Sequence, residues 1–267
     1  MDIVVFSSIL GIGSLGLLFG VGLAYASKKF AVEVDPKIEQ ILDELPGANC
    51  GGCGFPGCSG YAEAVVNSGT DTTLCAPGGD EVVLKIAEIL GVEAATKEPK
   101  VAVVQCRGDK ENAPNRFIYD GVEDCSAAQL VMNGAKGCVY GCLGLGSCVR
   151  ACPFDAMEMR ENGLPFVFED KCTACGICVT TCPRDIMALI PRSQKIFLGC
   201  VSQDKAKNVK SVCKVGCTGC TLCSKEKVTP SGSIEMNGNL PKILDVTADD
   251  LQNAVEKCPT KTFVVRD

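Results

Sequence analysis

The fold of this chain is decided by CTACGICVTTCP, residues 172–183. Its cysteines follow the spacing C-x2-C-x2-C-x3-C-P, which bacterial proteins with two [4Fe-4S] clusters use. At this spacing the first three thiolates, Cys172, Cys175 and Cys178, bind one cluster, while Cys182 crosses to a second cluster. The stretch therefore predicts a small fold built around two cubane clusters.

The composition indicates the same chemistry. The 267-residue chain holds 20 cysteines and no histidine, and its aromatic content is only 5%. The lack of histidine excludes histidine-ligated zinc fingers, Rieske centres, histidine-ligated haem and histidine acid–base catalysis. A disulfide framework is an alternative, but secreted scaffolds follow a signal peptide and do not repeat this spacing. Thiolate chemistry on iron remains, and its common use is electron transfer.

The N-terminal residues predict a membrane anchor. Residues 3–27 carry no charge, and a helix of that length exceeds the ~30 Å thickness of the hydrocarbon core. Asp2 stands where a cleavable signal peptide would be basic. Lys28 and Lys29 follow the apolar run, so the positive-inside rule places the rest in the reducing cytoplasm. We expect a single-pass protein of the cell membrane, with the lipid bilayer as one partner and the soluble part cytoplasmic.

A first group of four cysteines precedes the deciding stretch. Residues 49–58 read NCGGCGFPGC, and Cys75 follows them. Glycines between ligands let the backbone fold tightly and point N–H groups at the sulfurs. Zinc is the alternative for four cysteines at these spacings. We predict a [4Fe-4S] cluster on Cys50, Cys53, Cys58 and Cys75.

Two related modules follow from Cys138 onward. The matching cysteines, 75 or 76 residues apart, are Cys138/Cys213, Cys142/Cys217, Cys148/Cys223 and Cys182/Cys258. The second module has Lys227, Ala248, Leu251 and Ala254 where the first has Cys152, Cys172, Cys175 and Cys178. Those four cysteines are the complete ligand set of one cluster in a two-cluster ferredoxin. Their joint loss indicates that the sites are cubanes rather than scattered thiols.

Spacing and repeat together predict four [4Fe-4S] clusters. The predicted ligand sets are Cys50/Cys53/Cys58/Cys75, Cys138/Cys142/Cys148/Cys182, Cys152/Cys172/Cys175/Cys178 and Cys217/Cys220/Cys223/Cys258. The second set needs a ligand from outside its triplet, because Leu145 stands opposite Cys220. Cys138, one helical turn before Cys142, is the nearest candidate, and Cys125 and Cys106 are the alternatives.

Four cysteines stay without a cluster in this scheme: Cys106, Cys125, Cys200 and Cys213. Cys106 and Cys200 each end a short apolar run, at 101–104 and 196–198, that predicts a strand. Free cysteines are commonly buried as small hydrophobic residues. A fifth cluster is the other interpretation.

In these motifs the chain resembles the B subunit of the Rnf complex, the membrane-bound ferredoxin:NAD⁺ oxidoreductase. The resemblance covers the whole chain and rests on YASKK at 25–29, LPGANCGGCGFPGC at 45–58, CAPGG at 75–79 and the deciding stretch. Residues 137–148, GCVYGCLGLGSC, are similar to the version in anaerobic, clostridial-type members.

The resemblance implies an electron-transfer subunit of an oxidoreductase and translocase. Such a subunit takes electrons from reduced ferredoxin and passes them to flavin- and cluster-bearing partner subunits, whose net reaction reduces NAD⁺ and exports Na⁺ or H⁺. No complete active site is expected in this chain alone. The alternatives are an electron-input subunit for nitrogenase or for a redox sensor, and a zinc-binding interaction module.

We predict an α+β chain with one N-terminal transmembrane helix followed by small iron–sulfur cluster domains, including ferredoxin-like modules. The expected division is an anchor at 1–27, a four-cysteine domain at 28–95, an α/β connector at 96–136, a two-cluster ferredoxin-like module at 137–191 and a degenerate one-cluster module at 192–267.

The charge distribution suggests where ferredoxin docks. The chain is acidic, with a net charge of −6, but residues 192–227 carry eight basic side chains and two acidic ones. An acidic ferredoxin would be steered to this patch, near Lys205, Lys207 and Lys210. An ordinary solvated lysine face is the alternative. No nucleic-acid partner is expected.

Overall fold

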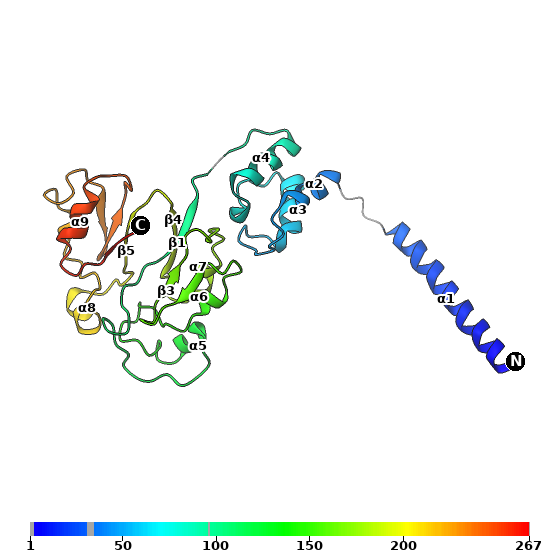
Figure 1. The fold of residues 1–267 in the computed structure, drawn as a ribbon, viewed down its shortest axis with the longest axis horizontal. Coiled ribbons are helices and arrows are strands. Elements are labelled where there is room, and N and C mark those ends of the chain that lie inside the picture. Colours follow the sequence, from blue (N-terminus) through cyan, green and yellow to red (C-terminus); the bar gives the residue numbers. More distant parts are fainter. Residues whose placement is uncertain (1–2, 31–34, 96, 267) are drawn as a thin grey trace.

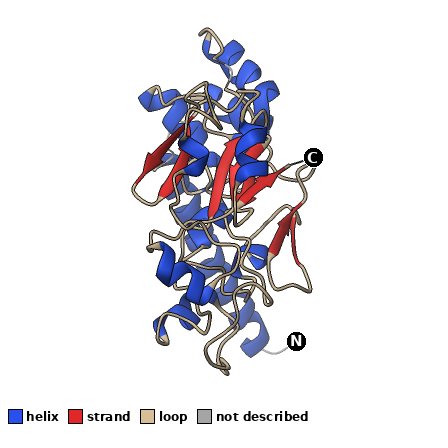
Figure 2. Cartoon of the chain, turned by 90° about the vertical axis from the view of Figure 1, so that its left-hand side faces the viewer, coloured by secondary structure: helices blue, strands red, loops and turns tan. Residues whose placement is uncertain are grey.

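The structure is a computed structural model and describes residues 3–30, 35–95 and 97–266. A long N-terminal helix stands apart from three small units that follow one another across the molecule (Figure 1). The described strands form four two-stranded antiparallel sheets, with short helices between them (Figure 2). This mixture of helices and strands confirms the predicted α+β class.

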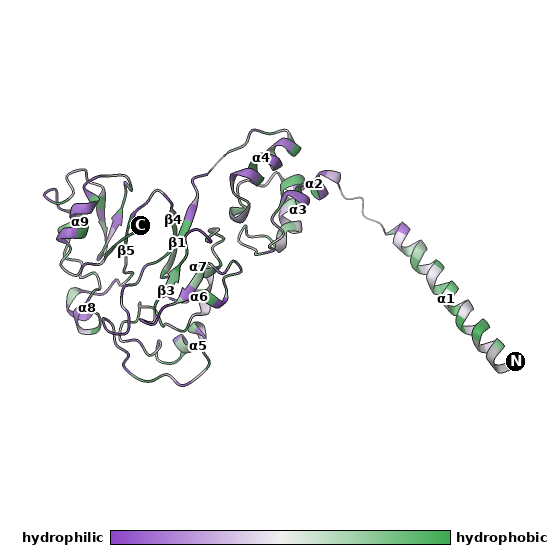
Figure 3. Ribbon diagram, viewed as in Figure 1, coloured by the Kyte–Doolittle hydropathy of each residue, from purple (hydrophilic) through white to green (hydrophobic). Residues whose placement is uncertain are grey.

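The N-terminal helix α1 spans Ile3–Lys29. Residues Ile9–Lys29 have a mean hydropathy of 1.9, and none of this window is buried against the rest of the protein. Figure 3 colours most of this helix as hydrophobic or neutral residues. Such a helix is long and apolar enough to cross a membrane. It ends at the basic pair Lys28 and Lys29.

A helical unit comes next, built from α2 (Pro36–Glu44), α3 (Gly57–Ser68), the 3-10 turn η1 (Ala76–Gly78) and α4 (Gly79–Leu90). Asp35 caps α2 by accepting the Lys37 N–H at 2.8 Å. Ile41 and Ile86 are fully buried in its core, where Tyr61 also packs. Cys53, Cys58 and Cys75 lie against this core, so the helices hold the first four-cysteine loop in place.

The central unit contains two of the small sheets. Strand β1 (Lys100–Val104) pairs with β4 (Met187–Pro191), and β2 (Met157–Met159) pairs with β3 (Pro165–Val167). Helices α5 (Cys125–Leu130), α6 (Ser147–Arg150) and α7 (Ile177–Thr181) carry or precede its cysteines. The β1–β4 register sets Ala102 opposite Leu189. The first strand of the expected 96–136 connector therefore belongs to the sheet of the central unit.

The C-terminal unit repeats this plan. It contains β5 (Ile196–Leu198), α8 (Ala206–Val212), the turn η2 (Leu222–Ser224), β6 (Ile234–Asn237), β7 (Leu240–Ile243), α9 (Leu251–Lys257) and β8 (Phe263–Val265). β5 pairs with β8 and β6 with β7. Arg266, just after β8, is 9% exposed and forms an ion pair with Glu169 of the central unit. The two units are therefore packed together.

An apolar core occupies the second module where the repeat has lost a cluster. Leu251 and Ala254, which stand where the first module has Cys175 and Cys178, are 2% and 0% exposed. They pack with Ile234 and Phe263, and Ala248 lies against the same core. Apolar side chains thus fill the space that four cysteines surround in the first module. This replacement supports the interpretation of the repeat as a pair of cubane modules, one of them degenerate.

Candidate metal centres

The twenty cysteines lie in five groups of four, and none forms a disulfide. The groups are the N-terminal group Cys50/Cys53/Cys58/Cys75, the run group Cys152/Cys172/Cys175/Cys178, the crossed group Cys125/Cys142/Cys148/Cys182, the C-terminal group Cys217/Cys220/Cys223/Cys258 and the junction group Cys106/Cys138/Cys200/Cys213. Every cysteine belongs to one group and only one.

In the N-terminal group, Cys50 and Cys53 lie in the loop between α2 and α3, Cys58 is in the first turn of α3, and Cys75 immediately precedes η1. The backbone of this loop is left-handed at Asn49 (φ 46°) and at Gly51 (φ 70°), which a chain turning tightly around a centre requires. Asn49 accepts the N–H of Cys58 through its side-chain oxygen at 2.9 Å. Burial raises the pKa of Cys75, and the charges of the other three thiols raise it further. The four side chains therefore share one electrostatic site.

The run group lies at the N-terminal end of α7. Gly176 (φ 82°) precedes the helix in the left-handed conformation, and Ala174 (φ 58°) has the same conformation in the loop before it. The Ala102 N–H donates to Cys172 Sγ at 3.5 Å, so strand β1 supports the site. Burial raises the pKa of Cys178 to about 12, and the neighbouring thiols Cys172 and Cys175 add to the shift.

The crossed group brings Cys182 to Cys142 and Cys148, although Cys182 is close in sequence to the run group. Burial raises the pKa of Cys148 to about 11, with further contributions from the charges of Cys125 and Cys182. Burial raises the pKa of Cys142 to about 12. This placement is the crossing that the spacing predicts.

The structure differs from the predicted second set in its fourth member, which is Cys125 and not Cys138. The prediction assumed a helical turn between Cys138 and Cys142, but these residues form a non-helical turn closed by Gly141 N–H to Cys138 C=O at 3.1 Å. Cys138 then lines a different cavity. Cys125 begins α5, and its N–H donates to Ser147 Oγ at 2.8 Å, beside Cys148.

The C-terminal group contains an exposed cysteine, Cys220, whereas the cysteines of the other groups are buried or partly buried. Burial raises the pKa of Cys223 to about 12. Burial acts in the same direction on Cys258, but hydrogen bonds from the Thr262 N–H (3.4 Å) and from Thr260 outweigh it and lower the pKa of that thiol. Backbone and hydroxyl donors of this kind stabilise a thiolate ligand.

The junction group consists of cysteines that local spacing does not connect. Cys106 and Cys200 follow β1 and β5, the two strands expected from the apolar runs, and Cys138 and Cys213 are the first pair of the repeat. The sequence signal for this group was the set of leftover cysteines. Its members are up to 107 residues apart, so only the folded chain shows that they meet.

The residues present fit anionic clusters better than single metal ions. A zinc ion with four thiolates needs sulfurs within about 4 Å of one another, since Zn–S is about 2.3 Å. In the described part of the chain, no three His, Cys, Asp or Glu side chains are arranged to hold one metal ion. Lys136 and Arg184 are 4% and 8% exposed, and no ion pair with a carboxylate is found for either among the described residues. Buried cations need an anionic partner, which a thiolate-ligated cubane provides.

Comparison with known proteins adds an independent finding. A family model for an Fe-S cluster matches residues 45–77, and one for a 4Fe-4S dicluster domain matches residues 137–187. The chain is 43% identical, over 100% of both proteins, to the B subunit of the ion-translocating oxidoreductase complex of Methanosarcina acetivorans. It is 43% identical to the B subunit of the Na⁺-translocating ferredoxin:NAD⁺ oxidoreductase complex of Acetobacterium woodii, over 93% of this chain and 74% of that protein. It is 44% identical to the proton-translocating counterpart in Clostridium ljungdahlii, over 92% and 87%.

Proposed function

This chain belongs to the B-subunit family of ion-translocating oxidoreductase complexes, and we propose that it is the electron-input subunit of a ferredoxin:NAD⁺ oxidoreductase. It is a membrane-associated iron–sulfur protein with several [4Fe-4S] clusters, and other subunits of the complex are its partners. The observation that carries the proposal is the grouping of the cysteine thiols in fours around shared cavities, with the buried cations Lys136 and Arg184 beside two of these groups.

We assign four clusters to the N-terminal, run, crossed and C-terminal groups. When bound, a [4Fe-4S] cluster accepts and returns one electron. The protein binds each cluster with four thiolates, excludes water with its small apolar cores and directs backbone N–H groups at sulfurs. The Ala102 N–H on Cys172 and the Thr262 N–H on Cys258 are two such donors. Each donor stabilises the additional negative charge of the reduced state and so raises the potential.

The groups lie in a series that leads toward the membrane anchor. The C-terminal unit is farthest from α1, the central unit follows, and the helical unit is nearest to α1 (Figure 1). The helical and central units meet at Gly52, where an added Cβ would clash with the Cys175 carbonyl oxygen. The charge of Cys50 also acts on Cys175. Electrons entering at the exposed Cys220 would thus leave from the N-terminal group.

Ferredoxin docking is assigned to α8 and the residue that precedes it. Lys205, Lys207 and Lys210 are exposed, and Val209 on the same helix is buried, so the lysines face solvent. An acidic partner steered to this face would arrive beside the C-terminal unit, where Cys220 reaches the surface.

The test is rapid anaerobic mixing of the full chain with reduced ferredoxin, followed by the loss of visible cluster absorption. The triple variant K205E/K207E/K210E should slow this reaction strongly at low salt and little at high salt, because salt screens exposed charges. The variant K37E/K100E/K242E makes the same change in net charge at exposed lysines elsewhere and should react like the parent. Equal rates for both triple variants at low ionic strength would refute the docking site.

We assign the soluble part to the cytoplasm. Lys28 and Lys29 end the apolar helix α1 and mark its cytoplasmic side. Protease added outside intact cells should leave the residues beyond 30 uncut, while protease added to inverted vesicles should remove them. Digestion in intact cells would refute this orientation.

A further inference from the structure

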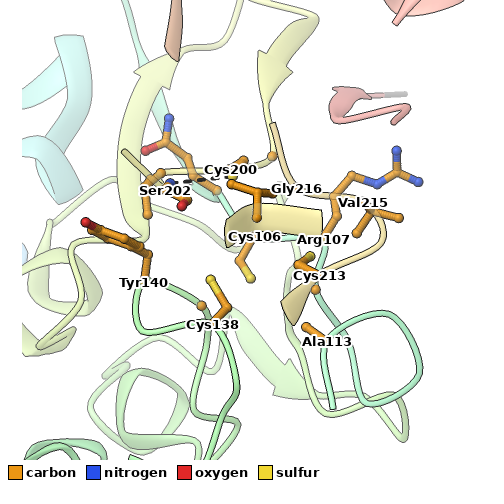
Figure 4. Close-up of a pocket in the computed structure, with 16 residues that line it drawn as sticks. Cys106, Arg107, Ala113, Cys138, Tyr140, Cys200, Ser202, Cys213, Val215 and Gly216 are labelled. Atoms are coloured by element: carbon orange, nitrogen blue, oxygen red, sulfur yellow. Dashed lines mark hydrogen bonds between the residues drawn. The ribbon is translucent and has the colours of Figure 1, made fainter. Parts of the chain in front are cut away.

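The junction group occupies the boundary between the central and C-terminal units. Cys106, Cys138 and Cys213 turn their sulfur atoms toward a common space, with Cys200 above them in the view (Figure 4). A Cβ at Gly108 would lie 3.4 Å from Cys213 Sγ and 3.7 Å from Cys106 Sγ, so both sulfurs are close to the same point. A Cβ at Gly216 would lie 3.5 Å from Cys213 Sγ. Glycine at these positions leaves room beside the sulfurs.

Each unit contributes two equivalent cysteines. Cys106 and Cys200 both come two residues after a strand, and the two strand ends are joined by the Arg107 N–H to the Gly199 carbonyl at 3.1 Å. Cys138 and Cys213 are matching positions of the repeat. Two related units therefore each supply two thiols from equivalent positions. Chance packing of unassigned cysteines would not produce this symmetry, so the arrangement indicates a binding site.

The surroundings of the group are suited to an anion. The charges of Cys106 and Cys138 act on the buried guanidinium of Arg184. The buried ammonium of Lys136 acts on Cys213, and the one hydrogen bond found for it is a long one, 3.4 Å to the Asp109 carbonyl. The guanidinium of Arg184 donates to the carbonyls of Asn133, Cys138 and Gly141, and its Nε has no hydrogen-bond partner among the described residues. If the thiols were neutral, carbonyl oxygens would be the acceptors for these two cations and no anion among the described residues would balance their charge, which is costly in the interior.

We propose that Cys106, Cys138, Cys200 and Cys213 bind a fifth [4Fe-4S] cluster, which joins the C-terminal group to the crossed group. The assignment rests on the proposed electron-transfer function and extends it by a site between the two modules.

Contacts on both sides support this position. The N–H of Cys142, in the crossed group, donates to Cys106 Sγ at 3.4 Å. The backbone amide of Cys217, in the C-terminal group, lies near the thiol of Cys200. A cysteine of each neighbouring group therefore lies next to a cysteine of the junction group. With this site loaded, the order is C-terminal, junction, crossed, run and N-terminal group, without a gap between the modules.

The test counts clusters on the full chain, purified anaerobically in detergent, by native mass spectrometry together with iron and sulfide analysis. The parent should carry five clusters, which corresponds to about twenty irons per chain. The double variant C106S/C200S should carry four. The matched double variant C125S/C142S should also carry four, but should lose the crossed cluster and keep the junction cluster.

Electron paramagnetic resonance of the reduced proteins distinguishes the two variants. In C106S/C200S, the crossed and C-terminal clusters should no longer show magnetic coupling to a cluster between them. In C125S/C142S, the junction and C-terminal clusters should still be coupled to each other. A parent with four clusters, or with one zinc ion or a disulfide at the junction, would overturn the proposal. This count decides the matter even where a variant fails to fold.

The outcome is separable from that of the proposed function. Five clusters that ferredoxin does not reduce would contradict the electron-input function alone. Four clusters that ferredoxin does reduce would contradict the fifth site alone.

Discussion

Lys136→Met should lower the reduction potentials of the two clusters beside it. Lys136 is 4% exposed, and its positive charge acts on Cys142 of the crossed group and on Cys213 of the junction group. Its ammonium donates a long hydrogen bond, 3.4 Å, to the Asp109 carbonyl. Methionine has a similar length and no charge, so it keeps the packing and removes the cation. Reduction adds negative charge, and the variant lacks the cation that stabilises that charge.

The expected size follows from Coulomb's law. We place the ammonium about 8 Å from the centre of each cluster, beyond the thiolates on which it acts, and use an effective dielectric constant of about 20, which gives about 2 kcal/mol. For a one-electron couple, in which 59 mV is a factor of ten, this equals about 90 mV. Both potentials should fall by an amount of this order.

The assay is a redox titration of the full chain followed by electron paramagnetic resonance. Two clusters should shift downward and the others should stay near their parent values. Lys242→Met removes an exposed lysine on β7 and serves as the control, because solvent screens that charge. If no cluster moves by more than about 20 mV, or if all move together, the assigned role of Lys136 is incorrect.

Three further changes test other parts of the structure. Cys182→Ala should damage the cluster of the crossed group and spare the cluster of the run group, because Cys182 lines the same cavity as Cys142 and Cys148. Spectra that show loss of the run cluster instead would contradict this assignment of Cys182. Arg266→Ala removes the ion pair with the partly exposed Glu169 and the hydrogen bonds to the carbonyls of Pro191 and Gln194, and it should destabilise the packing of the C-terminal unit by about 1 to 2 kcal/mol, measured as a lower urea midpoint and faster proteolysis between the units. Glu169→Gln leaves the buried guanidinium without its anionic partner and should be destabilising in the same assay. Asp71→Asn removes the ion pair with Lys97, which is 2.7 Å long and exposed, and should cost under about 1 kcal/mol. Hydrogen bonds from Lys97 and Thr73 lower the pKa of Asp71 from 3.8 to about 2, so the stability that this carboxylate contributes is fully present above its pKa in the unfolded chain and is lost as the pH falls through about 2. The difference in urea midpoint between the parent and Asp71→Asn should therefore be constant from pH 5 to 8. A difference that grows across that range would rule out this carboxylate as the cause.

Local patterns in the sequence were sufficient where the ligands of a site are close along the chain. The deciding stretch placed Cys172, Cys175 and Cys178 together, because short spacings restrict how far apart three thiols can lie. The repeat located the degenerate module, and the structure fills that position with Leu251 and Ala254. Composition alone predicted the apolar helix α1, and the relatives confirm the family and its iron–sulfur character.

Only the tertiary structure decided which distant cysteines share a site. Cys138 and Cys142 are four residues apart, yet the turn between them directs them into different groups. Cys125 reaches Cys148 through the docking of α5 on Ser147, a contact that no spacing encodes. The junction group depends on two strand ends joined by a hydrogen bond between Arg107 and Gly199. Such contacts form only when whole units pack against one another, and the spacing of residues along the chain does not determine that packing.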